Sequence, residues 1–368
     1  MPHWDMPAGR SGVISPSNEG DTPDMVIIGI DAHKRTHTVV IVDEQGRQLG
    51  TKTVGTTTAD HLALLSWAKR YDDELVWAVE DCRHLSRRLE RDLLAAGQRI
   101  VRVPPKLMAN MRDSARSFGK SDPIDALAVA RAALREPDLP AARLDGPERE
   151  VRLLVDHRED LVAERTRIIS RLRWHLHELD PGWEPTARSL DRSRGLEQTA
   201  SRLDGVPGVV ARIARELIDR CRHLNAEIKQ FEAEITALVE ELAPSLLAVR
   251  GCGPLTAAKI VGETAGVRRF RSRDAYARHN GTAPLPVWSS NRTRHRLSRS
   301  GNRQLNAALH RIALTQARVH PDARALIARR RANGDGGLEA LRVLKRRLSD
   351  VVYRALLADS DILPAGIT

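Results

Sequence analysis

The first regular pattern in the chain is a short apolar run that ends at a carboxylate. The segment MVIIGIDAHK at residues 25–34 has four β-branched residues before Asp31. Such a run predicts a strand that is buried on both faces. A carboxylate at the tip of a buried strand is costly unless a cation lies beside it, and a metal ion is the first candidate. A strand-end Asp can also simply cap the next turn, so the case for a metal depends on residues further along the chain.

Alternation of apolar and polar residues then predicts a small sheet. Residues 36–54 alternate around the turn-like segment DEQG and predict a hairpin that continues from the first strand. Helical spacing at residues 59–70 and 85–96 alternates with two further strand patterns, ELVWAVED and RIVRVPP. The order βββαβαβ followed by helices is the ribonuclease-H-like order of an α/β mixed sheet. Related sheets also occur in kinases and other ATPases, so this order alone assigns no function.

Four acidic residues fall where this fold would bring them together. Asp31 and Glu80 end strands one and four, which are parallel neighbours in a sheet of this order. Asp122 and Asp125 lie one turn apart at the start of the helix in KSDPIDALAVARAAL. An N-cap role would explain Asp122 alone but not the whole set. Clustered carboxylates repel one another unless hard divalent cations neutralise them, so we predict a site for Mg²⁺, with Mn²⁺ as a substitute. The other acids of this region are expected at the solvated surface: Asp43, Asp81 and Asp92.

The middle of the chain carries two long helical patterns, at residues 147–179 and 209–242. In the second, apolar residues alternate at spacings of four and three. This seam predicts a coiled coil about 50 Å long, at 1.5 Å per residue. The rod either joins two protomers or packs against the first helix of the same chain, and we favour a role in dimerisation or partner spacing. The seam consists of Leu217, Cys221, Leu224, Ile228, Phe231, Ile235, Leu238 and Leu242.

Composition limits the class of protein and its partners. No run approaches the roughly 18 apolar residues of a membrane span, and the first 24 residues lack a signal-peptide core, so we expect a cytoplasmic protein without a membrane partner. The three cysteines include no CxxC pair, which argues against a thiolate zinc site. From position 246 onward the chain has 23 Lys and Arg against 8 Asp and Glu, whereas residues 1–245 have 36 against 40. Positive charge concentrated in this way indicates a nucleic-acid partner.

The basic third contains two motifs that suit a phosphate backbone. Gly251 and Gly253 predict a tight turn that leads into the next helix, similar to a helix-hairpin-helix element, although a plain helix connection gives the same pattern. A Pro-flanked loop further on places Ser289 and Ser290 among arginines. These hydroxyls either contact phosphate or supply a nucleophile. The expected nucleic-acid-binding residues are Gly251, Gly253, Lys259, Arg292, Arg294, Arg296, Arg299 and Arg303.

Taken together, the motifs GIDAHK, KSDPIDA, NGTAP and HRLSRSGNRQLNAAL resemble the insertion-sequence "one-ten" family of bacterial transposases. Members of that family are DEDD transposases, also known as bridge-RNA-guided recombinases. The resemblance covers almost the whole chain, from position 25 to about position 354. It implies a RuvC-like domain with the tetrad Asp, Glu, Asp, Asp, which matches Asp31, Glu80, Asp122 and Asp125 here.

The resemblance also implies a C-terminal transposase domain with a catalytic serine a few residues after a Gly-x-x-Pro turn. The segment GTAP at 281–284 places that serine at Ser289. Many members have Gly after this serine and Glu-x-Thr-Gly at the second acid. This chain has Ser290 and Glu80-Asp-Cys-Arg instead, which leaves Ser290 as an alternative nucleophile. The implied activity is DNA strand exchange through a circular form, guided by a noncoding RNA that the element encodes.

These observations give one domain plan and three candidate functions. The plan is a disordered leader at 1–24, a RuvC-like DEDD domain at 25–140, a helical coiled-coil region at 146–243 and a mostly helical serine transposase and DNA-binding domain at 246–360. The expected function is a Mg²⁺-dependent transposase that acts as a dimer or tetramer in the bacterial cytoplasm, at the nucleoid. The alternatives are an RNase-H-like nuclease of the Holliday-junction-resolvase type, in which Ser289 only holds phosphate, and a non-catalytic nucleic-acid-binding protein.

Overall fold

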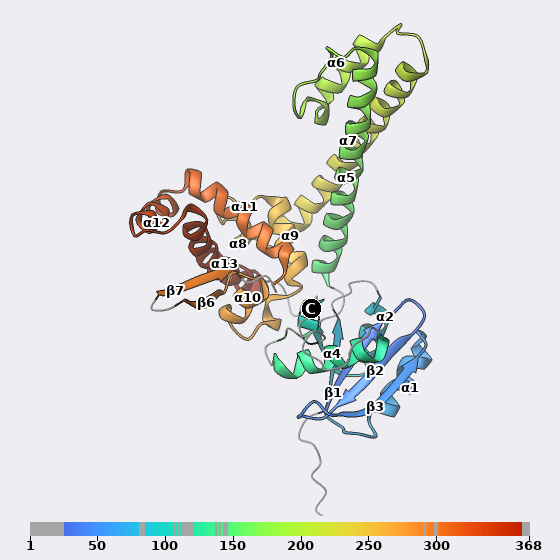
Figure 1. The fold of residues 1–368 in the computed structure, drawn as a ribbon, viewed down its shortest axis with the longest axis vertical. Coiled ribbons are helices and arrows are strands. Elements are labelled where there is room, and N and C mark those ends of the chain that lie inside the picture. The colour runs from blue at the N-terminus through green and yellow to red at the C-terminus, as the bar shows by residue number, and fades with distance from the viewer. Residues whose placement is uncertain are drawn as a thin grey trace, which may run out of the picture.

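The computed structural model comprises a sheet domain, a helical stalk and a mostly helical C-terminal region (Figure 1). The described residues are 26–80, 85–105, 107–108, 111, 121–136, 139, 141–142, 146–289, 292–297 and 301–362. The leader expected at 1–24 lies outside them, as do Asp81, Cys82, Ser290 and Arg299.

The N-terminal domain is built on a five-stranded sheet. Its strands are β1 (Val26–Ala32), β2 (His37–Val42), β3 (Gln48–Val54), β4 (Leu75–Glu80) and β5 (Arg99–Val103). Their spatial order is β3-β2-β1-β4-β5. Both pairs on the β3 side are antiparallel, whereas β1 pairs with β4, and β4 with β5, in parallel. This arrangement confirms the order predicted from the sequence and is that of an RNase-H-like mixed sheet.

Helices cover both faces of the sheet. The helices are α1 (Thr58–Ala68), α2 (Arg87–Ala95) and α4 (Asp122–Arg135). Because strand side chains alternate between faces, Ile28 and Ile30 pack in the core with α1 and α2, whereas Ile27 packs in the core with α4. Asp31 shares the alternation of Ile27 and Gly29 and therefore belongs to the face that α4 covers.

Two acids expected at the solvated surface are buried, so that expectation was wrong. Asp43 accepts hydrogen bonds from the backbone N–H groups of Gln45 and Arg47 and from the Arg47 guanidinium. Asp92 lies 2.7 Å from Nδ1 of the buried His61. Asp43 is thus satisfied by its own turn, and Asp92 has a partner 31 residues away, and neither contact can be read from the charge pattern of the sequence.

The stalk is formed by two long helices, α5 (Pro147–Leu179) and α7 (Val209–Leu242), with α6 (Ser193–Leu203) and the short helix η1 (Ser189–Asp191) at its far end (Figure 1). The seam predicted on α7 packs within the same chain. Cys221, Leu224 and Ile228 share a core with Leu172 and Leu176 of α5. Of the two arrangements that the sequence leaves open, the described residues therefore show the intramolecular one, and contact between protomers stays a prediction.

The C-terminal region is mostly helical, as predicted. It contains α8 (Pro244–Leu247), α9 (Pro254–Thr264), η2 (Val267–Arg269), α10 (Arg273–His279), α11 (Arg303–Val319), α12 (Pro321–Ala332) and α13 (Gly337–Ile362). Its core includes Val155 of α5 and Val239 of α7, so the base of the stalk is built into it. Within the described residues, no helix combines the length and the apolar character needed to cross a bilayer.

An antiparallel hairpin interrupts this helical region, where the sequence predicts a loop. Strands β6 (Pro284–Ser289) and β7 (Arg292–Leu297) form it, and Ser289 is registered with Arg292 at its tip. Pro284 and Pro286 obscured the strand in the sequence, but a two-stranded ribbon has free edges at which proline is tolerated. The described residues therefore place Ser289 at the end of β6.

Candidate metal centre

The sheet brings the two strand-end acids to one edge. β1 and β4 are parallel neighbours, and their last registered pair is Ile30 with Val79. Asp31 and Glu80 are the next residues on β1 and β4, so they are neighbours across the two strands. Asp31 is 7% exposed, and Glu80 is half-buried. The backbone of the sheet therefore fixes the positions of both carboxylates.

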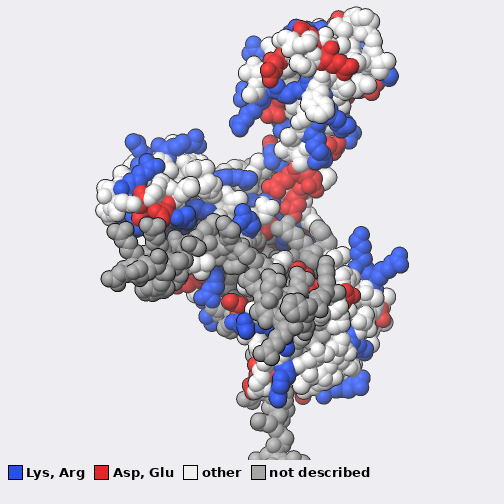
Figure 2. Space-filling model, in the orientation of Figure 1, with Lys and Arg blue, Asp and Glu red and all other residues white. Residues whose placement is uncertain are grey.

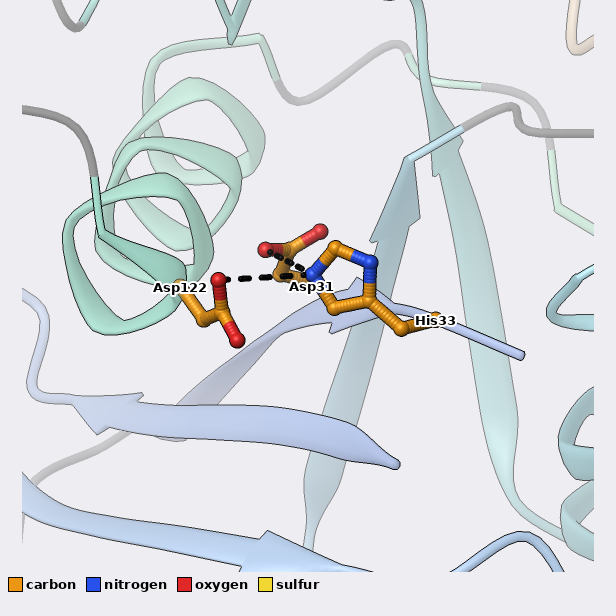
Figure 3. Close-up of side chains that lie close together, drawn as sticks. All are labelled: Asp31, His33 and Asp122. Carbon is orange, nitrogen blue, oxygen red and sulfur yellow. Dashed lines mark hydrogen bonds and ion pairs between the residues drawn. The ribbon is translucent and has the colours of Figure 1, made fainter. Parts of the chain in front are cut away.

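Helix α4 supplies a third acid to the end of β1 (Figure 3). Asp122 is the first residue of α4, and Ser121 before it is the N-cap. The Oδ1 atom of Asp122 lies 3.4 Å from Nε2 of His33, which in turn lies 3.1 Å from Oδ2 of Asp31. Because Ser121 occupies the capping position, the N-cap role does not account for Asp122.

The three side chains form a candidate metal centre. One ligand atom from each of Asp31, His33 and Asp122 lies within 4.8 Å of the others. Burial raises the pKa of the Asp31 carboxyl above its ordinary value. The charge of His33 opposes this shift, whereas the negative charges of Asp125 and Asp122 add to it. Asp125, which is 8% exposed, therefore acts on the same site from one helical turn further along α4.

This donor set fits a divalent cation. Carboxylate oxygens are the ligands that Mg²⁺ and Mn²⁺ use, and an imidazole nitrogen is a better ligand for Mn²⁺ than for Mg²⁺. The crowding of Asp31 by Asp122 and Asp125 is the repulsion that a bound cation would offset. The site combines a rigid, buried carboxylate on β1 with an exposed carboxylate on α4, which leaves one side open to a substrate.

His33 is the member of this group that sequence reasoning missed. It follows Asp31 by two residues, so both lie on the same face where β1 ends. The backbone N–H of His33 donates to the Thr36 carbonyl at 3.0 Å, which closes the turn between β1 and β2. The signal was present in the sequence as Asp-x-His at a strand end.

One predicted nucleic-acid contact is contradicted by the structure. Lys259 is only 3% exposed, and its Nζ lies 3.1 Å from Asp156 Oδ1 and 2.8 Å from Glu159 Oε2, both on α5. A phosphate contact requires an accessible ammonium, whereas the Lys259 ammonium is buried and forms ion pairs with two carboxylates. Lys259 therefore ties α9 to the base of the stalk.

The predicted glycine turn is present, but its two glycines differ. Gly251 has a positive φ of 87°, and a Cβ there would meet the Thr315 side chain of α11 at 3.1 Å. Gly253 is the N-cap of α9 and has no neighbour within 4 Å of an added Cβ. Of the two glycines, Gly253 is the one that borders open space. The assignment of this turn as a helix-hairpin-helix element stays a prediction.

The remaining predicted contacts lie around the hairpin. Arg292, Arg294 and Arg296 are on β7, and the exposed Arg303 begins α11. Figure 2 shows further Lys and Arg side chains on the C-terminal region and acidic side chains over the lower stalk. Figure 1 draws the hairpin strands β6 and β7 beside the C-terminal helices, and β1 and α4 in the sheet domain, so the two sets of elements belong to different regions of the molecule.

Two protein-family models match the chain. A DEDD-type model described as "Transposase" matches residues 28–181, and a model described as "Transposase IS116/IS110/IS902 family" matches residues 243–328. The chain is 29% identical to the insertion element IS116 uncharacterized 44.8 kDa protein of Streptomyces clavuligerus, over 91% of this chain and 95% of that protein. It is 28% identical to the insertion element IS900 uncharacterized 42 kDa protein of Mycobacterium paratuberculosis, over 92% of this chain and 98% of that protein. It is 25% identical to the mini-circle putative transposase for IS117 of Streptomyces coelicolor, over 90% of this chain and 94% of that protein.

Among solved structures, the chain is similar to T. thermophilus RuvC in complex with a Holliday junction substrate. The identity is 17%, and the match covers 32% of this chain and 99% of that chain with a TM-score of 0.26. The fold assignment of the N-terminal domain rests on the order and directions of its own strands.

Proposed function

Because this chain belongs to the IS116/IS110/IS902 family of transposases, enzymes of DNA strand transfer, we propose that it cleaves and rejoins DNA with a divalent cation and a serine nucleophile. The cation, Mg²⁺ in the cell, would be held by Asp31, Glu80, Asp122 and Asp125. The observation that carries the metal-dependent part is the convergence of ligand atoms from Asp31, His33 and Asp122 within 4.8 Å.

The residues of the centre have separate roles in this proposal. When bound, the cation would polarise the scissile phosphate and stabilise the negative charge that develops on it. Asp31 is fixed by the buried strand β1 and provides the rigid ligand. The exposed Asp122 faces the side from which a phosphate approaches. His33 hydrogen-bonds to Asp31 and so holds that carboxylate in one orientation.

Ser289 is the proposed nucleophile. Its Oγ gives up its proton and attacks the phosphorus, so that a P–O bond to the serine forms and the P–O bond to one DNA strand breaks. The departing oxygen of that strand takes up one proton and becomes a hydroxyl, which balances the proton lost by the serine. The protein–DNA ester conserves the energy of the phosphodiester, so attack by another DNA hydroxyl rejoins the strand. Support comes from the GTAP segment, whose Pro284 begins β6, and from the register of the hairpin, in which Ser289 is paired with Arg292, a residue type that favours a phosphate.

We further propose that the enzyme acts as a homo-oligomer with a guide noncoding RNA, at the nucleoid. The strand β6, which ends at Ser289, and the elements β1 and α4, which carry Asp31 and Asp122, lie in different regions of one chain (Figure 1). An assembly of two or more protomers would let the hairpin of one chain reach the metal centre of another. The resemblance of the sequence motifs to the one-ten family supports the RNA partner, and the basic C-terminal third supports binding of both polyanions.

The test is a denaturing gel of end-labelled element-end DNA incubated with protein, Mg²⁺ and RNA from the element's flanks. Wild type is compared with Ser289→Ala, Ser290→Ala and Asp122→Asn. The proposal expects a protease-sensitive, slowly migrating band that is absent from Ser289→Ala and from Asp122→Asn. Loss of the band in Ser290→Ala alone would move the nucleophile to that residue.

A hydrolytic nuclease is the second candidate, because the carboxylate centre is assembled by one chain without Ser289. In that case Asp31, His33 and Asp122 would hold a cation whose chemistry there would be the activation of water. Free cleaved DNA in both wild type and Ser289→Ala, without an adduct, would establish this alternative. DNA binding without any Mg²⁺-dependent product in wild type would leave a binding protein only.

A further inference from the structure

The charge on helix α11 is all of one sign and lies on one side. None of its 17 residues is Asp or Glu, whereas the long helices of the stalk carry acids and arginines together. Apart from Val319 at its end, its exposed residues fall within about 100° of one another around the helix axis, at about 100° per residue. They form one continuous stripe, which consists of Arg303, Gln304, Ala307, Arg311, Leu314 and Arg318.

The arginines of this stripe are available to a ligand. Within the part of the chain that the structure describes, none of the three forms an ion pair with a carboxylate. On the stalk, by contrast, the exposed Arg220 lies 2.8 Å from Glu164. Figure 1 shows α11 on the outer side of the C-terminal region, where Figure 2 shows Lys and Arg side chains. A guanidinium group without an acidic partner can offer its full set of donors to a phosphate.

The stripe begins at the root of the β6–β7 hairpin. The backbone N–H of Asn302 donates to the His279 carbonyl at 2.6 Å, and the Asn302 side chain caps α11. A Cβ on Gly301 would lie 2.3 Å from the backbone nitrogen of Gly281, so the segments that flank the hairpin are pressed together. Arg303, which follows directly, therefore has a fixed position beside the hairpin root.

The other half of the stripe lies against the predicted glycine turn. A Cβ on Gly251 would meet the Thr315 side chain of α11 at 3.1 Å, and Gln316 Nε2 donates to the Arg250 carbonyl at 2.8 Å. Arg250 is exposed, and Gly253 borders open space. One face of α11 therefore joins the hairpin to the glycine turn, over the roughly 18 Å of helix that precede Thr315, at 1.5 Å per residue.

This surface fits the backbone of a DNA duplex. A duplex carries one negative charge per about 1.7 Å of its axis, so a straight row of arginines meets phosphates along its whole length. Between the arginines, Ala307 is small, and Leu314, which is 45% exposed, offers apolar surface to a sugar. An α-helix matches the width of the major groove of B-form DNA, whereas the major groove of an RNA duplex is deep and narrow. The shape and charge therefore favour duplex DNA.

We propose that the stripe on α11, with Arg303, Arg311 and Arg318, binds the phosphate backbone of duplex DNA between the hairpin and the glycine turn. The inference rests on the proposed function in that DNA is the substrate, and it does not require Ser289 to be the nucleophile. Contacts to phosphate position a duplex without reading its sequence. The stripe therefore fixes the DNA relative to the hairpin.

The test measures binding of a fluorescently labelled DNA duplex by anisotropy across a salt series, in EDTA so that no chemistry occurs. Arg311→Gln and Arg318→Gln each change an exposed side chain, so both variants should melt as wild type does. Each should weaken binding equally on duplexes of different sequence and reduce the slope of log affinity against log salt by about 0.9. The double variant should reduce the slope by about 1.8, because two phosphate contacts are lost.

Arg220→Gln is the matched control, because it removes the same charge from an exposed arginine that already pairs with Glu164. Its salt slope should equal that of wild type. An unchanged slope in the double variant would overturn the inference. An equal decrease in Arg220→Gln would also overturn it, since net charge alone would then explain the effect, and so would a loss confined to an RNA duplex of the same sequence.

The assay separates this inference from the proposed function. It contains no cleavage step, so a failure to detect a serine adduct would leave its result intact. A wild-type protein that bound no DNA would reject both the inference and the proposed function, whereas a wild type that bound DNA with the same slope as the double variant would reject the inference alone.

Discussion

Gly29 of β1 lies so close to Ala126 of α4 that a Cβ at position 29 would be 2.1 Å from the Ala126 carbonyl oxygen. The same Cβ would meet the Cβ of Ala130 at 2.7 Å. Small residues on both elements therefore let α4 pack directly onto the centre of the sheet. This close approach is what brings Asp122, at the start of α4, to Asp31 at the end of β1.

We expect Gly29→Ala to damage both stability and the metal centre. The new methyl group would meet backbone atoms, which cannot move away as a flexible side chain could. The free energy of unfolding should fall by about 1–3 kcal/mol, as for other overpacked cores, and Mn²⁺ affinity should fall because α4 is displaced. Denaturant unfolding and Mn²⁺ titration measure the two effects.

Gly253→Ala is the matched control for that change. Its added Cβ has no neighbour within 4 Å, so only the N-cap preference of α9 is affected, at about 1 kcal/mol or less. Mn²⁺ binding should be unchanged in this variant. Unaltered Mn²⁺ affinity in Gly29→Ala as well would show that the packing of α4 does not position the ligands.

A second prediction concerns Asp31 and pH. The pKa of its carboxyl is raised in the folded protein, chiefly by burial, so the ionised form is destabilising. Stability of the metal-free protein should therefore decrease as pH rises through the pKa of Asp31. Asp31→Asn removes this penalty, so it should raise the melting temperature in EDTA at neutral pH and have little effect in acid, while abolishing DNA strand transfer.

Asp43→Asn should change the melting temperature at neutral pH in the opposite direction, by lowering it. Burial acts to raise the pKa of Asp43, but hydrogen bonds and charge from Arg47 outweigh it and hold the pKa below its ordinary value. The ionised carboxylate therefore stabilises the fold, and this contribution is lost as pH falls through the folded pKa. Melting curves of the two variants between acid and neutral pH should diverge in opposite directions from wild type. If both variants shifted the melting temperature in the same direction, the conclusion that ionised Asp31 destabilises the metal-free protein would be wrong.

The ion pairs of Lys259 give a third prediction. Lys259→Met leaves Asp156 and Glu159 without their shared cation at the junction of α9 and α5. Both carboxylates are about one-third exposed, at 32% and 38%, so water offsets part of the loss. We expect a decrease of about 1–3 kcal/mol in the free energy of unfolding. A double-mutant cycle with Asp156→Asn would measure the coupling, and a coupling near zero would mean that the pair is incidental.

Much of this architecture follows from local patterns in the sequence. The β-branched run before Asp31 and the alternation through β2 and β3 predict the sheet because strand side chains alternate between faces. The long helices α5 and α7 begin and end where the sequence predicts. Asp31, Glu80, Asp122 and Asp125 could be proposed together because the order of the strands in this fold class fixes which strand ends are neighbours.

The features that sequence reasoning missed depend on contacts between distant segments. Lys259 looks like any basic residue after a glycine turn until α5 places two acids beside it, 103 and 100 residues away. The β6–β7 hairpin was hidden because proline usually argues against a strand. The pairing of Lys345 with Asn306 joins two helices across 39 residues, and no periodicity indicates that a lysine on α13 will be buried.

His33 provides the last prediction, because its Nε2 lies beside Asp31 and Asp122 at the candidate metal centre and is also hydrogen-bonded to Asp31. Oxygen ligands serve Mg²⁺ and Mn²⁺ alike, but nitrogen favours Mn²⁺. His33→Gln replaces the nitrogen with an amide of similar reach. Its affinity for Mn²⁺, followed by the electron paramagnetic resonance of the free ion, should fall by about tenfold, as outer and inner ligand changes commonly do. Its affinity for Mg²⁺, measured by competition, should change much less. An equal loss for both ions would instead mean that His33 acts only by orienting the Asp31 carboxylate, to which its Nε2 lies within 3.1 Å.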